Sequence, residues 1–188
     1  FYLGFPGLLV NQILMAIFAE LLTVFDPELN SLEHMLMPPD EVFWLGTDQF
    51  GRDLLTRIIY GARTALLVGF TCAIVGATLG LVLGVASAYF GGMFDLILQR
   101  VVDVVMAFPL IILALAVVAT LGPGTQNVII AITIPFIPQC ARVVRSSALA
   151  IREIPYIDAA RALGFSDMRI ILRHMVPNVM APYLIMLT

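Results

Sequence analysis

The sequence predicts an all-α, polytopic membrane protein, and three observations lead to this fold class. Of the 188 residues, 61% are hydrophobic and only 12% are charged, and the mean hydropathy is +1.01. An ordinary soluble domain is about 45–50% apolar and about 25% charged, and a chain of this length cannot enclose so much apolar surface. The apolar residues also form long runs with few charges, as membrane-spanning helices do. These observations argue against a soluble enzyme, a disordered chain and a disulfide-stapled secreted module.

Four apolar runs are long enough to cross a membrane, which takes about 20 residues. A fifth run begins near the end of the sequence, and both ends are apolar, so we expect a fragment of a longer protein. Two polar segments separate the runs, an outward loop at 26–63 and a cytoplasmic loop at 147–177. We therefore expect a single transmembrane domain over residues 1–188, with spans at about 1–25, 64–90, 101–121 and 127–146 and a partial span at 178–188.

The placement of arginine predicts the orientation of these spans. The segment 142–174 contains six arginines, whereas the segment 26–63 contains three arginines against seven acidic residues. Basic residues concentrate in the cytoplasmic loops of membrane proteins. We therefore expect the 147–177 loop in the cytoplasm, the 26–63 loop outside and the N-terminus inside.

Small residues in the second span indicate close helix packing. Gly76, Gly80 and Gly84 recur every four residues, and Ala88 continues the same row. Four small residues on one helix face let another backbone approach closely. We expect this face to pack against a neighbouring helix, and the lining of a conduit is the alternative.

Prolines mark the later spans. Pro109 lies in the third span, and Pro135 and Pro138 lie in the fourth. Proline lacks the backbone N–H donor and tends to kink a helix, and kinked helices are able to line a transport pathway. Pro135, Pro138 and Gln139 are candidates for the lining of such a pathway, and for Gln139, beside Pro138, an interhelical hydrogen bond is the favoured role.

The cytoplasmic loop contains the most informative pattern. Pro155 suits the first turn of a helix and Gly164 its left-handed C-terminal cap, while Ser166 is a candidate N-cap for a second helix. We expect Pro177 to end that second helix and Asn178 to open the fifth span. Apolar residues recur at every third position of the first helix, namely Ile154, Ile157, Ala160 and Leu163. Periodicity alone leaves two interpretations open, a helix that docks in a groove of another protein and a helix that rests on lipid headgroups.

A motif in this loop combines a helix with a distant proline. The sequence reads Asp158-Ala-Ala-Arg-Ala-Leu-Gly164, nine residues, then His174-Met-Val-Pro177. It resembles the EAA loop of ABC importer permeases, which reads Glu-Ala-Ala, three residues, Gly, nine residues and Ile-x-Leu-Pro. Asp158, His174 and Val176 depart from that pattern, and Asp158 keeps the negative charge of Glu.

The resemblance implies a type I ABC importer transmembrane domain, which is a MetI-like helical bundle. In that family the loop is the coupling element that sits in a cleft of the ATPase. The residues to which the resemblance assigns this role are Asp158, Ala159, Ala160, Arg161, Gly164 and Pro177.

Further motifs extend along the whole chain. They lie at residues 45–53, 60–63, 89–92, 107–109, 121–124, 142–145 and 173–178. Together they are similar to motifs of the dipeptide, oligopeptide and nickel permease group, specifically its second-permease type. Phe43 stands where that group often has His.

This second resemblance implies one permease subunit of a peptide importer in the cytoplasmic (inner) membrane of a prokaryote, with six spans in the complete subunit. The implied partners are a homologous partner permease, two cytoplasmic ABC ATPase subunits, an extracytoplasmic solute-binding protein and the lipid membrane. The partner ATPases bind ATP and Mg²⁺, so we expect no cofactor, no metal and no catalytic residue in this chain. A chain without lysine also cannot form the Gly-x-x-x-x-Gly-Lys phosphate loop. Import of nickel or glutathione is the alternative within the family.

Two other classes fit the sequence less well. A secondary ion-coupled transporter requires ionisable residues near the bilayer midplane, and the second and fourth spans have none in their interiors. A membrane-embedded hydrolase requires a catalytic constellation, but His34 and His174 lie on opposite sides of the membrane in this topology. Cys72 and Cys140 fall in apolar runs, so we expect them to be buried rather than metal-binding. The net charge of −3 gives no nucleic-acid footprint.

The outward segment completes the set of expectations. We expect residues 46–63 to form a short amphipathic helix at the outer surface. Its side chains toward lipid or the bundle are Leu54, Leu55, Ile58 and Ile59. Its charged residues Asp48, Arg52 and Asp53 either contact the binding protein or pair locally. Arg100 and Asp103, three residues apart on one helix, are also expected to pair.

Overall fold

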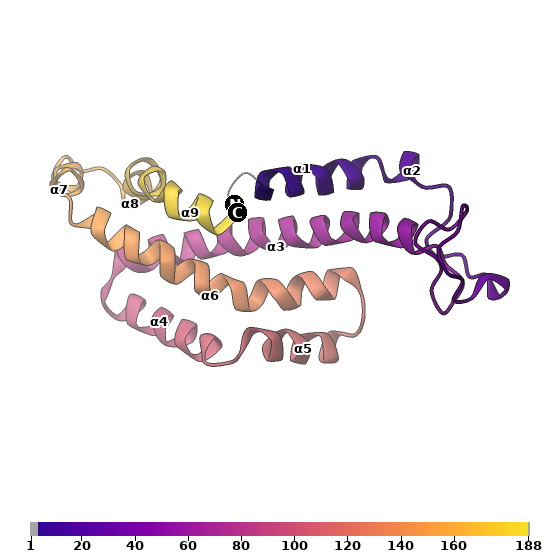
Figure 1. The fold of residues 1–188 in the computed structure, drawn as a ribbon. Coiled ribbons are helices and arrows are strands. Elements are labelled where there is room, and N and C mark those ends of the chain that lie inside the picture. Colours follow the sequence, from indigo (N-terminus) through magenta and orange to yellow (C-terminus); the bar gives the residue numbers. More distant parts are fainter. Residues whose placement is uncertain (1–3, 188) are drawn as a thin grey trace. The chain divides into compact units, whose positions relative to one another are not determined.

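The computed structural model describes residues 4–187, which are helical along most of their length and contain no β-strand (Figure 1). This architecture confirms the all-α fold class. Residues 1–3 and 188, which belong to the expected first and fifth spans, lie outside the described part of the chain. The α-helices are α1 Gly4–Ile17, α2 Ala19–Leu22, α3 Leu54–Phe90, α4 Gly92–Met106, α5 Leu110–Leu121, α6 Thr125–Arg152, α7 Pro155–Ala162, α8 Asp167–Ile170 and α9 Met180–Leu187. Tighter or wider helical turns occur at Leu32–His34 (3₁₀), Ile171–Met175 (π) and Val176–Val179 (3₁₀).

Three helical stretches in the described residues are long and apolar enough to cross a membrane: Leu54–Phe90, Thr125–Arg152 and Asp167–Leu187. Helices α4 and α5 qualify as a fourth only when taken together, and they are bent by 85° at the break between them. Pro109 lies at that break as the N-cap of α5, where its missing N–H leaves no helical bond to lose. The 14 residues of α1 fall short of the roughly 20 that a span requires. The structure therefore supports three or four crossing helices.

The chain forms two compact units, which divide at Gly69 and Phe70 within α3. The first unit contains α1, α2, the loop between α2 and α3, and the beginning of α3. The second unit contains the remainder of α3 and all later helices.

The loop of the first unit is held by hydrogen bonds to short polar side chains. The Asp48 carboxylate accepts the N–H groups of Phe50 (2.7 Å) and Arg52 (3.0 Å) and pairs with the Arg57 guanidinium. Partial desolvation raises the pKa of Asp48, but these donors outweigh it and hold its pKa below the usual value. The loop is therefore ordered by local charge pairing.

The amphipathic helix expected over 46–63 is wrong in its first half. Gly46 and Gly51 have φ angles of +77° and +72°, which an α-helix does not contain. The helix begins only at Leu54 and continues without interruption through α3. Arg52 and Asp53 do not pair with each other in the described structure, because Arg52 bonds to Asn30 at 2.7 Å.

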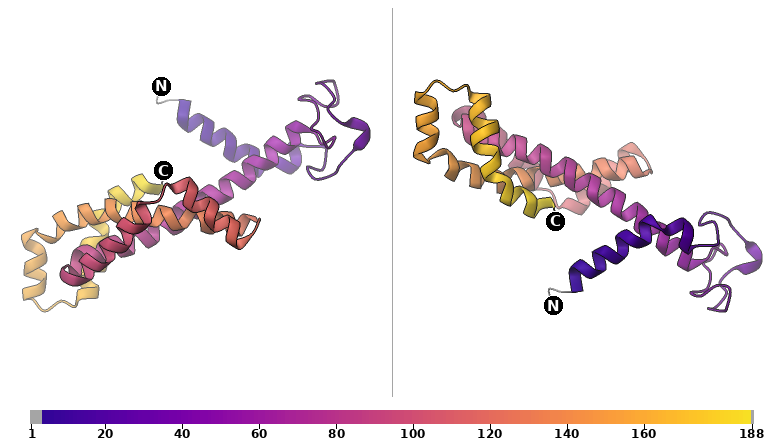
Figure 2. Two further views of the ribbon diagram at one scale, coloured as in Figure 1. Left: turned by 90° about the horizontal axis from the view of Figure 1, so that it is seen from below. Right: turned by 90° about the horizontal axis from the view of Figure 1, so that it is seen from above.

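Helix α6 is the centre of the second unit, where it contacts α3, α4, α5 and α9 (Figures 1 and 2). The glycine row of α3 faces this helix. A Cβ atom on Gly80 would lie 2.9 Å from the Ala141 nitrogen, and one on Gly84 would lie 2.6 Å from the Ala141 carbonyl oxygen. A Cβ on Gly76 would meet the Phe136 ring at 2.5 Å. Only glycine permits two backbones to approach this closely.

The remaining small residues of this contact are enclosed. Ala88 is fully buried, and Cys72 and Cys140 are buried free thiols, of which Cys72 donates to the Ile129 carbonyl at 3.5 Å. Both cysteines therefore occupy apolar packing positions, as the sequence predicts.

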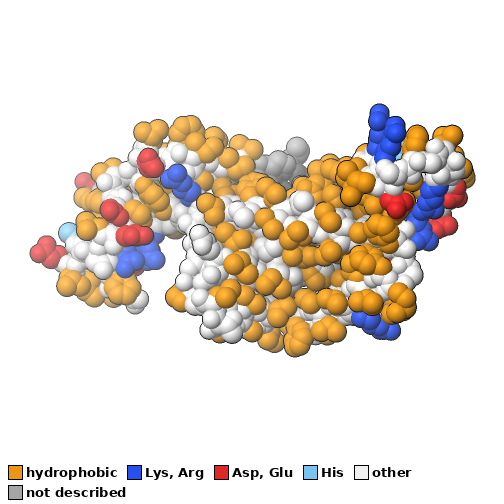
Figure 3. Space-filling view, turned by 180° about the vertical axis from the view of Figure 1, so that it is seen from behind, with side chains coloured by type: hydrophobic (Ala, Val, Ile, Leu, Met, Phe, Trp, Pro, Cys, Tyr) orange, Lys and Arg blue, Asp and Glu red, His pale blue; other side chains and the backbone are white. Residues whose placement is uncertain are grey.

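Large hydrophobic side chains cover much of the surface of the second unit. Figure 3 shows them spread over the helices on one face, while charged side chains gather over the loop of the first unit and over the α7 end of the second unit. Ile111 and Leu115 on α5 are 70% and 64% exposed. Such a surface suits lipid or further membrane helices rather than water.

Candidate functional site

Helix α7 carries the loop motif and lies at the end of the second unit where α3 turns into α4 (Figures 1 and 2). Pro155 occupies its first position, as expected, and the extended Ile154 precedes it as the N-cap. Asp158 lies in the first turn, where the helix dipole favours a negative charge. Its carboxylate pairs with Arg161 at 3.2 Å, and both side chains are exposed. The motif thus presents one charged pair on the surface.

The opposite face of α7 is anchored in a core. Ile157 is fully buried and Ala160 is 5% exposed, whereas Ala159 is exposed. The core residues around them come from the ends of α3 and α6 and from the chain after α7, namely Val85, Ala88, Tyr89, Val144, Ala148, Ile170, Met175 and Val179. The adjacent alanines of the motif, Ala159 and Ala160, therefore lie on two different faces of the helix.

The expected apolar stripe of α7 is shorter than its periodicity predicts. Ile154 and Leu163 are both exposed, because they cap the helix and do not lie within it. Of this stripe, only Ile157 and Ala160 are therefore buried.

Gly164 ends α7 in a Schellman motif. Its N–H donates to the Arg161 carbonyl at 2.9 Å, and the Phe165 N–H donates to the Ala160 carbonyl at 3.1 Å. The φ of Gly164 is +75°, and a Cβ atom there would meet nothing within 4 Å. Glycine is needed here for its backbone conformation and not for lack of space.

The chain after α7 returns as one continuous helical stretch. Ser166 precedes α8 as its N-cap residue, although its side chain makes no capping bond. The expectation that Pro177 ends this helix is wrong, because the π turn and the following 3₁₀ turn carry the chain through Pro177 into α9. These changes of helical register accommodate the proline ring and its missing donor.

Tyr156 ties α7 to this returning stretch. Its hydroxyl donates to the His174 carbonyl at 3.0 Å and accepts from the Asn178 amide at 3.0 Å, while Asn178 also donates to that carbonyl at 2.6 Å. The His174 ring stacks on Phe165 with centroids 6.0 Å apart. Hydrogen bonds and ring contacts thus fix the orientation of α7.

A second set of contacts involves the corner that α7 forms with the chain after it and the ends of α3 and α6. The Tyr89 hydroxyl donates to Asp167 at 2.6 Å, and the Arg161 guanidinium lies 5.2 Å from the centre of the Tyr89 ring. Arg152, at the end of α6, donates to the Ala88 carbonyl at 2.8 Å. These contacts therefore connect α7 and α8 to the end of α3, and the end of α3 to the end of α6.

Two Asp–Arg pairs join α4 to α6. Arg145 donates twice to Asp95, at 2.7 Å and 2.5 Å, and both side chains are largely buried. The buried Ser87 hydroxyl of α3 also donates to Asp95. Arg142 pairs with Asp103 at 2.5 Å, with both side chains about half exposed. Asp103 therefore pairs across helices, and the pairing expected with Arg100 is wrong.

Sequence reasoning missed the Asp95–Arg145 pair. A carboxylate and an arginine that lie in otherwise apolar helices signal mutual pairing, because an isolated charge is costly in the membrane. This rule indicates that both groups have partners, but it does not choose between Arg142 and Arg145 as the partner of Asp95.

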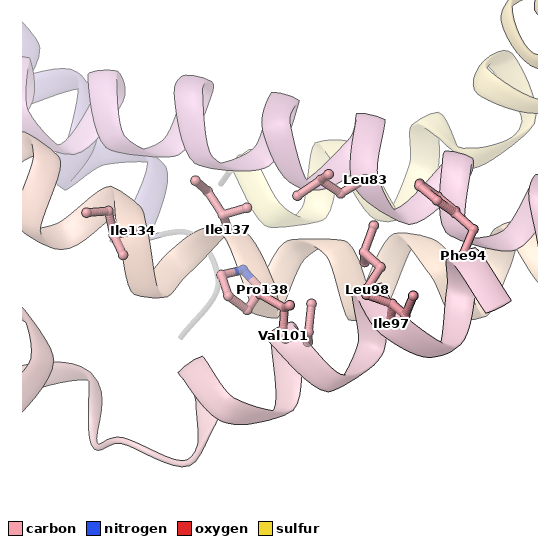
Figure 4. A pocket seen from close by; sticks show the side chains of 9 residues that line it. Leu83, Phe94, Ile97, Leu98, Val101, Ile134, Ile137 and Pro138 are labelled. Atoms are coloured by element: carbon pink, nitrogen blue, oxygen red, sulfur yellow. The ribbon is translucent and has the colours of Figure 1, made fainter.

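The expected pathway residues lie on α6. Pro135 and Pro138 are buried and do not interrupt the helix, whereas Gln139 is exposed. Figure 4 shows Pro138 beside an apolar pocket of about 430 Å³ between α3, α4 and α6. Leu83, Leu98 and Ile137 also line this pocket, which has no polar side chain among its lining residues.

The chain is similar to known transport proteins over most of its length. The sequence model of a family described as "Binding-protein-dependent transport system inner membrane component" matches residues 76–188. A putative peptide transport system permease protein of Brucella suis biovar 1 is 48% identical over 181 residues, which cover 96% of this chain and 61% of that protein.

Two further relatives are named for the transport of other solutes. The dipeptide transport system permease protein DppC of Alkalihalophilus pseudofirmus is 44% identical over 189 residues, 99% of this chain and 62% of the relative. The glutathione transport system permease protein GsiD of Pectobacterium atrosepticum is 39% identical over 167 residues, 88% of this chain and 56% of the relative. The chain spans about three fifths of the length of these relatives.

Proposed function

Because this chain belongs to the family of inner membrane components of binding-protein-dependent transport systems, we propose that it is the membrane-spanning permease subunit of an ATP-driven importer. Its solute is a di- or oligopeptide, with nickel or glutathione as the alternatives within the family. Names of relatives that mention peptide, dipeptide and glutathione transport support this class of solute.

The observation that carries this proposal is the two-sided construction of α7. The Asp158–Arg161 pair and Ala159 lie on its exposed face, while Ile157 and Ala160 fix the other face in the core. A helix presented in this way fits a groove of another protein. The proposed coupling residues are Asp158, Ala159, Ala160, Arg161, Gly164 and Pro177. Ala160 is the buried member of this set, whereas Pro177 is exposed.

The proposed mechanism uses the rigidity of this corner. Closure of two cytoplasmic ATPase subunits on ATP displaces α7, and the contacts of Tyr89, Tyr156 and Arg152 carry that displacement into the spans. The pathway then switches from outside to inside. A homologous permease forms the other half of the pathway, and an extracytoplasmic binding protein delivers the solute. ATP and Mg²⁺ bind to the ATPases, and this subunit contributes no catalytic residue or cofactor.

The proposed membrane arrangement places the N-terminus and α7 in the cytoplasm and the loop of the first unit outside. The surplus of arginine in residues 142–174 supports this orientation. In this proposal the complete subunit has six spans, and residues 1–188 contribute four of them and the beginning of a fifth. The bend between α4 and α5 then lies within one span.

A secondary ion-coupled transporter is the competing class. Such a carrier needs carboxylates that exchange ions near the midplane. Asp95 and Asp103, the acidic residues of α4, are both engaged by arginines. Inactivating the ATPases of the assembled complex separates the two classes. Transport by an ATP-driven importer then ceases, whereas transport by an ion-coupled carrier continues.

The exposed position of Ala159 provides the main test. A cysteine is placed there in the full-length protein, co-expressed with its partner permease and ATPases, with Cys72 and Cys140 replaced by alanine. We expect cross-linking to a cysteine in the ATPase cleft, and a change in yield on addition of ATP. Ala160→Cys is the matched control, because its side chain faces the core and is expected not to react. Equal reaction at both positions, or none in the assembled complex, contradicts the proposal.

Gly164 provides a second prediction. Gly164→Val forces a branched residue into positive φ, which costs roughly 1–2 kcal/mol, so we expect transport to fall severalfold while membrane insertion stays normal. Gly164→Asn is the control, since asparagine tolerates this conformation. Solute uptake into proteoliposomes measures both variants, and wild-type uptake by Gly164→Val removes the coupling role from this turn.

A further inference from the structure

Asp53 is a buried carboxylate with one oxygen unused. The residue is 7% exposed. Its Oδ2 accepts hydrogen bonds from the Thr56 N–H (2.9 Å) and the Thr56 hydroxyl (2.6 Å). Oδ1 is enclosed and has no hydrogen-bond partner within residues 4–187. A buried carboxylate oxygen without a donor is energetically costly, so this atom requires a partner that the described chain does not supply.

The nearby arginines do not fill this role. Arg52 donates to Asn30, Arg57 pairs with Asp48, and Arg63 lies 3.3 Å from Glu20. These are the three arginines of the 26–63 segment, and its histidine, His34, shares a hydrogen bond with Ser31 at 2.7 Å. Within the described chain, Asp53 is therefore a buried acid without a cationic partner.

Cavities of the first unit meet at this residue. One of about 280 Å³ and another of about 200 Å³ share Asp53 and Phe25 in their linings. The larger is also lined by Glu41 and Trp44, with the apolar Leu22 and Val42 as further walls, and no basic residue takes part. A third cavity, also bordered by Phe25, is lined by Glu20, Asp26 and Glu28. The smaller cavity is also bordered by His34 and Arg52, whereas the larger one is acidic and partly aromatic.

This combination selects a class of ligand. A carboxylate beside aromatic faces attracts an organic cation through charge and cation–π contact, and Leu22 and Val42 suit an apolar substituent. A divalent metal ion needs several oxygen ligands, and no cluster of three or more His, Cys, Asp or Glu side chains that suits a metal occurs among the described residues. We propose that the larger cavity binds the primary ammonium group of a small amphipathic organic molecule, with Oδ1 of Asp53 as its counter-charge.

A ligand can bind at Asp53 whether or not the protein transports a solute. The role of this binding in transport depends on the proposed function. If the loop lies outside, as the proposed function states, the cavity meets the amino group of a solute before translocation. This role rests on the proposed function. The experiment below measures binding alone, so the two proposals fail separately.

Trp44 allows direct detection, because it is the single tryptophan of the 188 residues and lines the cavity. An ammonium group reaches the enclosed Oδ1 only if lining side chains shift, so binding changes the surroundings of Trp44. The full-length protein in detergent, with tryptophans outside these residues replaced by phenylalanine, is titrated with 2-phenylethylammonium while the fluorescence is recorded. The neutral 2-phenylethanol, with the same carbon skeleton, is the matched ligand.

We expect saturable binding of 2-phenylethylammonium and at least tenfold weaker binding of 2-phenylethanol. Asp53→Asn keeps an oxygen for the Thr56 cap and removes the charge, so it should weaken the ammonium at least tenfold. Glu33→Gln, an exposed acid of the same loop that lines none of these cavities, should leave binding unchanged. Equal affinity for both ligands in the unmodified protein overturns the proposal even if Asp53→Asn fails to fold. Unaltered binding by a folded Asp53→Asn protein, or no binding at all, also overturns it.

Discussion

Replacing Gly84 by alanine is expected to destabilise the second unit, although alanine is the better helix former by about 1 kcal/mol. The added Cβ would lie 2.6 Å from the Ala141 carbonyl oxygen and 3.0 Å from the Val144 Cβ. The first of these atoms belongs to the backbone of α6, so no rotamer change relieves the contact and the helices must separate. Overpacking of this kind costs about 1–3 kcal/mol, and the unfolding midpoint of the full-length protein in mixed SDS micelles should fall.

Gly69→Ala is the matched control on the same helix. A Cβ atom at Gly69 meets nothing within 4 Å, so only the gain in helix propensity remains and the unfolding midpoint should rise or stay level. Opposite signs for two identical substitutions in α3 identify packing as the cause. A midpoint for Gly84→Ala at or above the unmodified value contradicts the close contact with α6.

The glycine row illustrates what the sequence predicts well. Spacing of four places Gly76, Gly80 and Gly84 on one helix face whatever the partner is, and the caps at Pro155 and Gly164 depend on backbone geometry within a few residues. Local rules of this kind do not require knowledge of distant segments. The all-α architecture, the start of α7 and its left-handed end follow from them.

Features that depend on distant contacts were predicted less well. Pro109 marks the place of the break between α4 and α5 in the sequence, but hydropathy and the proline together do not give its size of 85°. Pro177 carries a local signal for a helix end, but a π turn and a 3₁₀ turn override it, and this depends on the anchoring of His174 by Tyr156. The Arg100–Asp103 pairing follows from spacing on one helix, whereas the structure offers Asp103 a closer partner on another.

The same limit applies to the candidate site. The motif locates α7, but it does not tell which of two adjacent alanines faces outward. That choice is made by the core that encloses Ile157 and Ala160, to which α3, α6 and the returning helix contribute. Likewise, the free oxygen of Asp53 becomes apparent only when every neighbouring arginine is seen to be occupied.

Neutralising one partner of the Asp95–Arg145 pair is expected to produce the largest loss of stability among single charge removals. Arg145→Ala leaves the largely buried Asp95 carboxylate with the Ser87 hydroxyl as its remaining side-chain donor. Asp95→Ala leaves the largely buried Arg145 guanidinium without its carboxylate. Removing one partner of a buried pair costs about 3–5 kcal/mol. The double variant removes both charges, so its loss should be smaller than the sum of the two single losses by more than 1 kcal/mol.

The Asp103–Arg142 pair joins the same two helices with side chains about half exposed, and its cycle should give a coupling of at most about 1 kcal/mol. Unfolding midpoints of the seven proteins in the two cycles, which share the unmodified protein, measure both couplings. Equal coupling for the two pairs would show that burial does not set their strength. If α4 follows α6 through the buried pair, the double variant should also lose ATP-driven uptake while it remains folded, because α6 leads directly into α7 and the connection to α4 is then cut.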